Sequence, residues 1–408
     1  MRYNVRILEQ REDFYMKKQA LLFLLLGSLV ATGCNNNGGN SNTADPSSKG
    51  PDAGVEDLGV KDTHTDLMKQ YLADPDWTSI KTYVPKVNAE DSSYHNEQSQ
   101  PLPIELKFDE VAGAEKYVIQ IAKDGEFKDA KLVETDTNAY NFYNSELGQE
   151  YYYRAAVSEE ALAAAKVYKF KVDATAPRYI HVDGVINFRD SGGWKSSLVE
   201  NGVTKQGMYY RCVQFNNGNT KNITEEGMKA IKELNIKVDI DMRDSYNVPA
   251  TSPINTDDHP VEIMKASVAS GSEDGRWEGD HSRDHNIAAT YKKIFEAIAV
   301  ADEKPIALHC THGADRTGIV SWFLLGLLGV SKEDCARDYV MTRFAGERAV
   351  LPTGSGSEIE KWNAKTEALE GATWAEKTYN PLKDDFGIEA DTLETIREKF
   401  VEGYKRAA

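Results

Sequence analysis

Apolar and polar residues alternate along three runs of the chain, at residues 117–121, 151–157 and 167–172. A period of two is expected of β-strands that bury only one of their faces. All three runs lie within residues 85–174, so the pattern predicts an antiparallel β-sandwich over that stretch. The pair Ala176-Pro177 then marks a boundary, because proline restricts the preceding residue to extended geometry.

A different pattern surrounds residues 309–318. The residues before them, 305–308, form a short apolar run like a buried strand, and residues 319–328 are apolar over a length typical of a buried helix. The intervening segment is therefore predicted to be a strand-to-helix turn. Helical runs follow, and one begins at Ser331 in a sequence similar to a capping box. Residues 352–380 are polar and are interpreted as a surface insertion or a substrate-side excursion.

The beginning of the chain has the pattern of a secretory signal. From Met16 a basic start leads into an apolar run too short to span a membrane, and then into small residues. Cys34 follows Ala-Thr-Gly, which resembles the lipobox of bacterial lipoproteins. This resemblance implies removal of residues 1–33, lipidation of Cys34 and an extracytoplasmic, lipid-anchored location at the bacterial envelope. A plain secreted protein is the alternative.

A connecting segment is expected between Cys34 and the predicted sandwich, over residues 34–84. Residues 35–52 are rich in Asn, Gly and Ser, a composition that cannot bury a core and that favours a flexible tether. Residues 54–75 carry apolar positions at helical spacing and are interpreted as a short helical spacer. The remainder of the chain, residues 175–408, is then the chemistry-bearing domain.

Charge and cysteine usage exclude some classes of partner. Removing the five basic and three acidic residues of 1–33 changes the formal net charge from −17 to −19. Such an acidic chain is not expected to bind nucleic acid, or to adhere to anionic lipid by charge. Three cysteines remain besides Cys34, an odd number, so we expect no structural disulfide, with Cys212 and Cys335 as buried thiols.

The predicted turn places Cys310 and Arg316 six residues apart at the start of a helix. Free backbone N–H groups and the helix dipole attract an anion there and favour thiolate over thiol. Gly313 permits a tight turn that forms an anion nest, and the Arg316 guanidinium can hold two oxygens of a phosphoryl group. A buried core thiol and a surface cation are the alternative. The pattern favours a site for a tetrahedral anion.

With these residues the chain resembles the cysteine-dependent protein tyrosine phosphatase superfamily, whose signature is His-Cys-x5-Arg-Ser/Thr-Gly. It is most similar to the bacterial branch, because Asp315 precedes the arginine and because residues 187–193 are Asn-Phe-Arg-Asp-Ser-Gly-Gly and residues 241–243 are Asp-Met-Arg. The resemblance implies an α/β domain with a mixed central sheet flanked by helices on both faces. Residues 148–151 resemble the tyrosine corner of fibronectin type III domains, a member of the immunoglobulin-like sandwich class.

The resemblance also implies a mechanism. Cys310 would attack phosphorus to give a phosphocysteine that water hydrolyses, with no metal and no cofactor. The family reading gives His309 a part in lowering the thiol pKa, although a histidine at a strand end is equally expected. Thr317 would donate its hydroxyl to the sulfur, or would merely begin the helix. The phosphate-binding residues implied are Thr311, His312, Gly313, Ala314, Asp315 and Arg316.

The general acid is ambiguous in the sequence. Asp315 matches the bacterial branch and is our first candidate. Asp280, or else Asp284, is the second, because these residues lie in a glycine-containing segment, residues 271–284, that could close as a lid. We expect Arg189, Asp190 and Arg243 to hold the loop in shape through buried hydrogen bonds.

The substrate is left open. Relatives that resemble phosphoinositide phosphatases often carry lysine where Ala314 stands, so multiply phosphorylated inositides are disfavoured, and a protein tyrosine or dual-specificity phosphatase is preferred. An inositol phosphate or phosphoinositide phosphatase and a noncatalytic phospho-ligand-binding lipoprotein are the alternatives. Arsenate reduction and sulfur transfer explain the motifs less well. The expected partners are a phosphorylated protein or small phosphomonoester and, through Cys34, the membrane. No partner is predicted for the sandwich.

Overall fold

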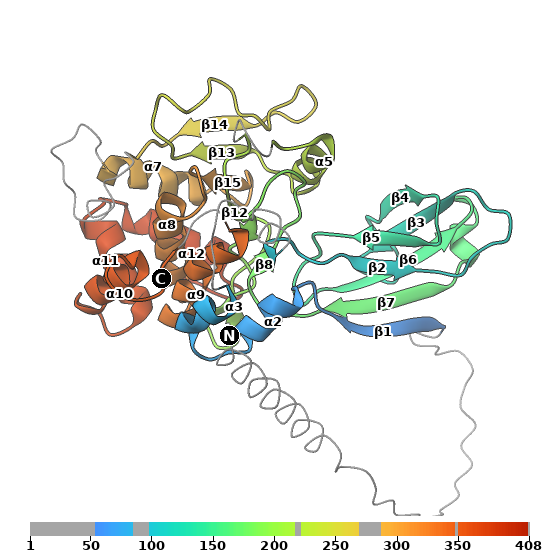
Figure 1. Cartoon of the computed structure of the whole chain (residues 1–408), viewed down its shortest axis with the longest axis horizontal. Helices are drawn as coiled ribbons and strands as arrows, with labels where there is room; N and C mark the ends of the chain where they lie inside the picture. Colours follow the sequence, from blue (N-terminus) through green and yellow to red (C-terminus); the bar gives the residue numbers. More distant parts are fainter. Residues whose placement is uncertain (1–53, 85–97, 217–221, 269–286, 347–349, 407–408) are drawn as a thin grey trace, which may run out of the picture. The chain divides into compact units, whose positions relative to one another are not determined.

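The computed structural model describes residues 54–84, 98–216, 222–268, 287–346 and 350–406. Within these ranges the chain forms two groups of strands, one in the N-terminal and one in the C-terminal half (Figure 1). The C-terminal group is a mixed sheet of six strands in the order β14-β13-β15-β12-β9-β8. Its members are β8 (Arg178–Tyr179), β9 (Arg189–Asp190), β12 (Tyr209–Cys212), β13 (Val238–Asp241), β14 (Glu262–Lys265) and β15 (Ile306–His309).

The centre of this sheet is parallel. Strand β15 pairs in parallel with β13 on one side and β12 on the other, and β9 and β8 continue the sheet antiparallel. Strands buried on both faces read as continuous apolar runs, which is how residues 305–308 appear in the sequence. The two faces bury different clusters: Tyr209 and Leu308 face one, Tyr210 and Ala307 the other.

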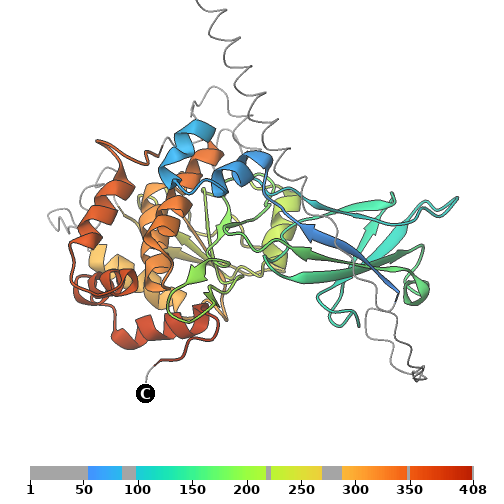
Figure 2. The same cartoon turned by 90° about the horizontal axis from the view of Figure 1, so that it is seen from below.

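Helices cover both faces, as the sequence led us to expect. Figure 2 shows the orange and red helices on one side of the sheet and the yellow-green helix α5 on the other. None of the helices in the described ranges is long and apolar enough to cross a membrane. The helices of this half are α5 (Glu225–Glu233), α7 (Ile287–Ile298), α8 (Asp315–Leu327), α9 (Lys332–Val340), η3 (Met341–Ala345), α10 (Glu358–Glu367), α11 (Trp374–Asp384) and α12 (Ala390–Phe400).

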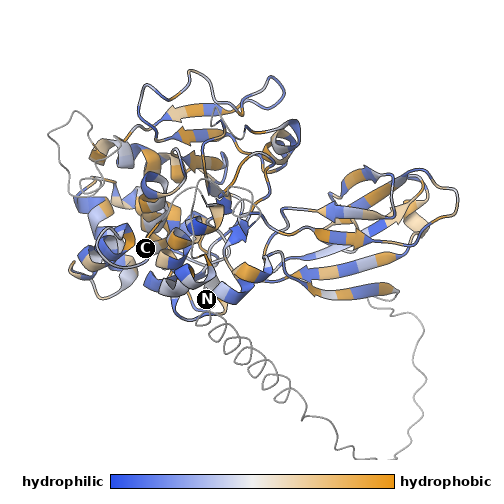
Figure 3. Cartoon of the chain, viewed as in Figure 1, coloured by the Kyte–Doolittle hydropathy of each residue, from blue (hydrophilic) through white to orange (hydrophobic). Residues whose placement is uncertain are grey.

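Helix α8 is the central helix of the domain. Every residue from Arg316 to Leu327 is buried, which explains why its sequence is apolar on all sides rather than amphipathic. Figure 3 shows the apolar residues gathered on β15 and α8. Helix α9 follows, and the Ser331 hydroxyl accepts a hydrogen bond from the Asp334 N–H at its start, as the capping pattern predicts.

The N-terminal strands form a five-stranded sheet in the order β1-β7-β6-β3-β4 and a two-stranded sheet, β2-β5. Side chains from both sheets, among them Leu106, Ile119 and Phe170, share one buried core. The strands are β1 (Val55–Lys61), β2 (Ile104–Lys107), β3 (Tyr117–Ala122), β4 (Lys131–Thr135), β5 (Ala139–Phe142), β6 (Glu150–Ala156) and β7 (Val167–Val172), with the turn η2 (Leu162–Ala164) before β7; short β10 (Lys195–Ser196) and β11 (Gly202–Val203) pair separately.

The interpretation of residues 54–75 as a helical spacer is wrong for its first half. Residues 55–61 are strand β1, which pairs in parallel with β7. The register shifts between Asp57 and Val60, and the half-buried positions are Val55, Leu58 and Lys61. The half-buried positions of this irregular strand therefore recur at every third residue, and this spacing imitates a helix.

Residues 66–83 contain three short helices and are more than a spacer. They form α2 (Asp66–Leu72), η1 (Trp77–Ser79) and α3 (Ile80–Tyr83). Met68, Tyr71 and Ile80 are fully buried and belong to the same core as α8. The Arg337 guanidinium donates to the backbone oxygen of Tyr71 at 3.1 Å. These helices are therefore part of the α/β domain, although the sequence placed them in the connecting segment.

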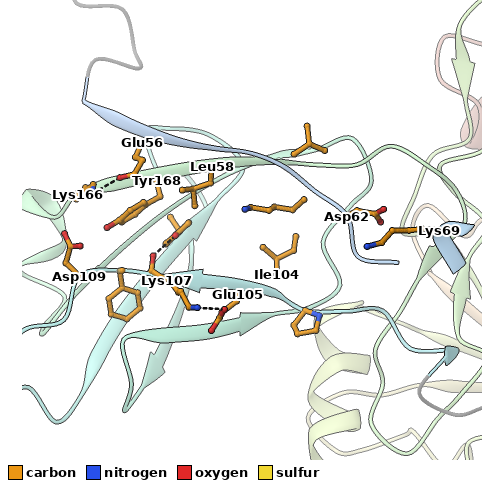
Figure 4. Close-up of a pocket in the computed structure, with 15 residues that line it drawn as sticks. Glu56, Leu58, Asp62, Lys69, Ile104, Glu105, Lys107, Asp109, Lys166 and Tyr168 are labelled. Atoms are coloured by element: carbon orange, nitrogen blue, oxygen red, sulfur yellow. Dashed lines mark hydrogen bonds and ion pairs between the residues drawn. The ribbon is translucent and has the colours of Figure 1, made fainter. Parts of the chain in front are cut away.

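An open groove of about 640 Å³ lies between strands β1 and β2 (Figure 4). Each of these strands pairs with only one described neighbour. Ion pairs line the two edges: Lys166 Nζ lies 2.6 Å from Glu56 on one, and Lys107 Nζ lies 2.9 Å from Glu105 on the other. Charged side chains along a strand edge oppose pairing with another chain, so these edges are protected against aggregation.

Candidate active site

The candidate nucleophile lies at the carboxyl end of the central strand. Strand β15 ends at His309, Cys310 follows it, and helix α8 begins at Asp315. This is the strand-to-helix turn that the sequence predicts. Cys310 is 3% exposed, and Ala314 precedes α8 without a side-chain cap for its N–H groups. Uncapped N–H groups at the start of a helix are available to an anion.

Gly313 is required by the turn. Its φ is +61°, and a Cβ atom there would lie 2.3 Å from the carbonyl oxygen of Cys212. The carbonyl oxygens of His312 and Gly313 accept hydrogen bonds from the Asn187 amide, at 3.2 and 3.3 Å. In a trans peptide the following N–H points away from the carbonyl. The N–H groups of Gly313 and Ala314 therefore point to the opposite side, as an anion nest requires.

The environment of Cys310 favours its thiolate. Burial raises the pKa of the thiol, but the nearby Arg316 guanidinium and hydrogen bonds from Thr317 outweigh burial, and the pKa falls below its ordinary value. Within the described part of the chain the buried Thr317 hydroxyl has no oxygen or nitrogen partner, which leaves it to the sulfur. Burial raises the pKa of Cys212 and Cys335, which are also buried, so they stay thiols.

Arg316 is fixed at the rim of the loop. It is 8% exposed, and its Nη1 donates to the backbone oxygens of Met242, at 3.2 Å, and Val268, at 3.1 Å. Its Nη2 lies 3.3 Å from the Thr311 hydroxyl, and its Nη1 lies 3.9 Å from an Asp244 oxygen. Because several groups orient the guanidinium before any ligand binds, little ordering remains for an oxyanion to impose.

His309 is part of a buried charged cluster on the sheet face away from α8. Its Nε2 lies 2.9 Å from an Asp239 oxygen, and its Nδ1 lies 4.0 Å from Asp241. Burial lowers the pKa of His309, but Asp239 and Asp241 outweigh it, so the pKa is raised and the imidazolium is favoured. The Arg243 guanidinium binds Asp241, at 2.6 Å, and Gln214, at 2.7 Å. Arg243 thus fixes one of the two carboxylates beside His309, that of Asp241.

A second buried network lies behind the loop. The Asp338 carboxylate, in α9, binds Arg189 at 3.1 Å and Arg211 at 2.5 Å. Arg211 donates to the Gly313 oxygen at 2.7 Å, and Arg189 donates to the Asn187 amide oxygen. Burial raises the pKa of Asp338, but the two guanidinium groups outweigh it and hold the pKa below its ordinary range. One carboxylate therefore anchors both connections to the loop.

The structure contradicts the prediction that Asp190 holds the loop in shape. Instead of holding the loop, its carboxylate binds the Arg178 guanidinium at 2.9 Å and the N–H groups of Gly192 and Gly207, both at 2.8 Å. Arg178 also donates to the Ser145 oxygen at 3.0 Å. Asp190 thus has a structural role on these groups. Three other candidates, Cys34, Asp280 and Asp284, lie outside the described residues.

Asp315 is the first residue of α8, and it is close enough to Cys310 for its charge to raise the pKa of the thiol. The Tyr339 hydroxyl donates to Asp315 Oδ1 at 2.9 Å. The sequence interpretation missed Asp338, Tyr339 and Arg211. One signal was available: Arg211 is a charge between Tyr210 and Cys212 in an apolar run, and a buried charge needs a partner.

The geometry suits a tetrahedral anion. A thiol of lowered pKa, a nest of N–H groups and a fixed guanidinium converge at the start of α8, and a carboxyl lies beside them. Such a set can stabilise charge on transferring oxygens while the sulfur acts as nucleophile.

Comparisons with known proteins agree with this site. The model of a family described as the tyrosine phosphatase family matches residues 180–407, which include the loop and its supporting networks. A tyrosine-protein phosphatase of Nostoc commune is 28% identical over 137 residues, which cover 29% of this chain and 45% of that protein. The chain therefore matches less than half the length of this curated relative.

Two solved structures of P. aeruginosa TpbA also match. A variant crystallised in complex with pTyr is 14% identical, with a TM-score of 0.25, and the match covers 43% of this chain and 97% of that one. The other TpbA structure is 15% identical, with a TM-score of 0.24, and the match covers 50% and 96%.

Proposed function

Since the chain belongs to the tyrosine phosphatase family, we propose that it hydrolyses phosphomonoesters through a phosphocysteine intermediate formed on Cys310. The observation that carries this proposal is the lowered pKa of Cys310 in a loop that also holds Arg316 and the uncapped start of α8. A thiolate is the nucleophile that the reaction needs, and the same charges that stabilise it can bind the phosphoryl oxygens.

In the first step the Cys310 sulfur attacks phosphorus, and the bond from phosphorus to the ester oxygen breaks. The loop N–H groups and Arg316 bind the three phosphoryl oxygens, whose charge is redistributed during transfer. Asp315 donates a proton to the departing oxygen. In the second step Asp315 takes a proton from the attacking water, phosphate leaves and the thiolate is restored. Thr317 stabilises the sulfur as it leaves phosphorus.

We assign phosphotyrosine-type substrates as the first choice. Ala314 is fully buried and brings no cation to the loop for a second phosphate, which supports a substrate with a single phosphoryl group. The TpbA variant was crystallised in complex with pTyr, and we extend that ligand class to this chain as part of the proposal. Alkyl phosphates and inositol phosphates are then poorer substrates.

The N-terminal strands are proposed to be a fibronectin type III-like module. The support is a side-chain bond at the start of β6: the Tyr151 hydroxyl accepts from the Glu146 N–H at 3.0 Å. A tyrosine that bonds back to the backbone a few residues upstream is the hallmark of a tyrosine corner. The proposed role of this module is to space the catalytic domain from its anchor.

The proposal includes a location. Met16 to Cys34 have the order of a lipoprotein signal, so we propose that the mature chain begins at a lipidated Cys34 and acts outside the cytoplasm. Labelling with a fatty-acid analogue tests this idea in cells that produce the full chain. The label should be incorporated by the native protein and lost in Cys34→Ala.

The activity is tested by hydrolysis of p-nitrophenyl phosphate by the full chain. Cys310→Ser should abolish turnover, whereas Cys335→Ser, the matched loss of another buried thiol, should retain it. Equal rates for native protein and Cys310→Ser would refute the proposal. A panel of phosphotyrosine and phosphoserine peptides and inositol phosphates then tests the substrate class. A higher kcat/KM for any other member than for the phosphotyrosine peptide contradicts the assignment.

A further inference from the structure

Tyr339 packs against the first turn of α8. It lies in α9 directly after Asp338 and is 2% exposed. Its ring packs edge-on against Trp362, with centroids 5.0 Å apart. Gly318, in the first turn of α8, makes room for the ring, because a Cβ atom there would lie 2.7 Å from it. These two contacts restrict where the Tyr339 hydroxyl can lie.

The Tyr339 hydroxyl binds the Asp315 carboxyl. The hydroxyl donates to Oδ1 at 2.9 Å, which is a good hydrogen-bond length, and Asp315 is itself only partly buried. A carboxyl on the first residue of a helix can otherwise rotate towards solvent or towards the helix N–H groups. The bond from Tyr339 opposes this rotation and keeps Asp315 on the side of α9.

We propose that Tyr339 is a positioning residue that holds the Asp315 carboxyl in the orientation from which it protonates the leaving oxygen. This inference rests on the proposed function. As the bond from phosphorus to the ester oxygen breaks, the Asp315 proton passes to that oxygen and the carboxyl becomes a carboxylate. Tyr339 keeps its own proton throughout, and its hydrogen bond becomes charge-assisted.

The stabilisation of Asp315 by Tyr339 grows during the reaction. A hydrogen bond to a carboxylate is stronger than one to a neutral carboxylic acid, so Tyr339 stabilises Asp315 more after proton transfer than before it. Interactions that strengthen towards the transition state accelerate the chemical step. The benefit applies only where the leaving group needs a proton, and this restriction separates a positioning role from simple packing.

The test uses Tyr339→Phe in the full chain with two aryl phosphates. Phenyl phosphate has a poor leaving group that requires protonation, and 2,4-dinitrophenyl phosphate has a good one that does not. The kcat/KM value reports on formation of the phosphocysteine. We expect it to fall roughly tenfold or more for phenyl phosphate. For dinitrophenyl phosphate we expect a change below about twofold, since no proton transfer assists that bond cleavage.

Three controls make the outcomes distinct. Asp315→Asn should show the same selectivity more strongly, and adding Tyr339→Phe to it should have no further effect. Tyr209→Phe removes another buried hydroxyl, which lies 3.1 Å from Ser321 Oγ, and should leave the ratio of the two substrates unchanged. Cys310→Ser reports separately on the proposed function, because it should abolish both activities.

Each remaining outcome would overturn either the role of Tyr339 or the assignment of Asp315 as the general acid. Selectivity in Asp315→Asn but not in Tyr339→Phe would overturn the role of Tyr339 alone. An equal loss for both substrates in Tyr339→Phe would also overturn it, since that result marks a structural defect. If Asp315→Asn lacks selectivity, the general acid of the proposed mechanism is wrong and the inference about Tyr339 falls with it.

Discussion

Asp338 is the residue whose loss should damage both the fold and the site. Replacing it with asparagine keeps its shape and removes its charge. Arg189 and Arg211 are at most 1% exposed, so two guanidinium groups would remain buried without a counter-charge. Removing one partner of a buried ion pair costs about 3–5 kcal/mol. A domain is stable by about 5–15 kcal/mol, so the variant should lose a large fraction of its stability.

Urea denaturation of the full chain, followed by tryptophan fluorescence, measures this loss. The midpoint should fall while the slope stays the same, because the surface exposed on unfolding does not change. Asp66→Asn is the matched control. It breaks the Lys69 ion pair, whose aspartate is 89% exposed, and should leave the midpoint nearly unchanged.

The contribution of Asp338 to the stability of the fold changes with pH in a definite direction. The pKa of Asp338 is below its ordinary value in the folded state, so its stabilising effect is present above the unfolded pKa of about 3.9 and is lost as the pH falls through the folded pKa. Asp338→Asn should therefore be less stable than the native chain at neutral pH, and this difference should shrink in acid.

The same variant tests the connection to catalysis. Arg211 bonds the Gly313 oxygen directly, so weaker anchoring should also lower kcat/KM for p-nitrophenyl phosphate. Combining Asp338→Asn with Arg211→Met should cost less than the sum of the two single changes, because the buried charges are coupled. A loss below about 1 kcal/mol in Asp338→Asn at neutral pH would refute the reasoning.

Three further predictions concern other parts of the domain. Gly313→Ala should lower kcat/KM by about a hundredfold or more, since its Cβ would lie 2.3 Å from the Cys212 oxygen; native activity in this variant would contradict the tight turn. Thr317→Ala removes hydrogen bonds that lower the pKa of Cys310, so alkylation by iodoacetamide should begin at a higher pH; an unchanged profile would exclude that effect. Met68→Ala should destabilise the full chain by about 2–5 kcal/mol, and an unchanged urea midpoint would argue against its place in the core.

The sequence predicted the strand-loop-helix arrangement around Cys310 because both flanking runs are buried on all sides, and burial leaves a strong apolar signal. It also predicted the mixed sheet with helices on both faces, through the resemblance of its motifs. It could not predict which buried charges pair. Arg189 and Asp190 are neighbours in the chain, yet adjacent residues of a strand point to opposite faces, and their partners are Asp338 and Arg178.

The N-terminal segment was harder to interpret for another reason. The half-buried positions of β1 recur every three residues, as they can on a helix, so the strand resembled a helix in the sequence. Helices of seven residues or fewer, such as α2 and α3, carry too few positions to show which core they join. Their packing partners lie more than two hundred residues away, as in the bond from Arg337 to Tyr71, and nothing local in the sequence records them.

This packing means that the two folds cannot be separated by a single cut. The chain enters through a strand of the N-terminal sheet, contributes α2 and α3 to the core of α8, returns for β2 to β7, and only then begins β8. A fragment that starts at residue 180, where the family match begins, would lack Met68, Tyr71 and Ile80. The N-terminal strands therefore cannot be removed at one point of the chain without also removing buried residues of the α/β core.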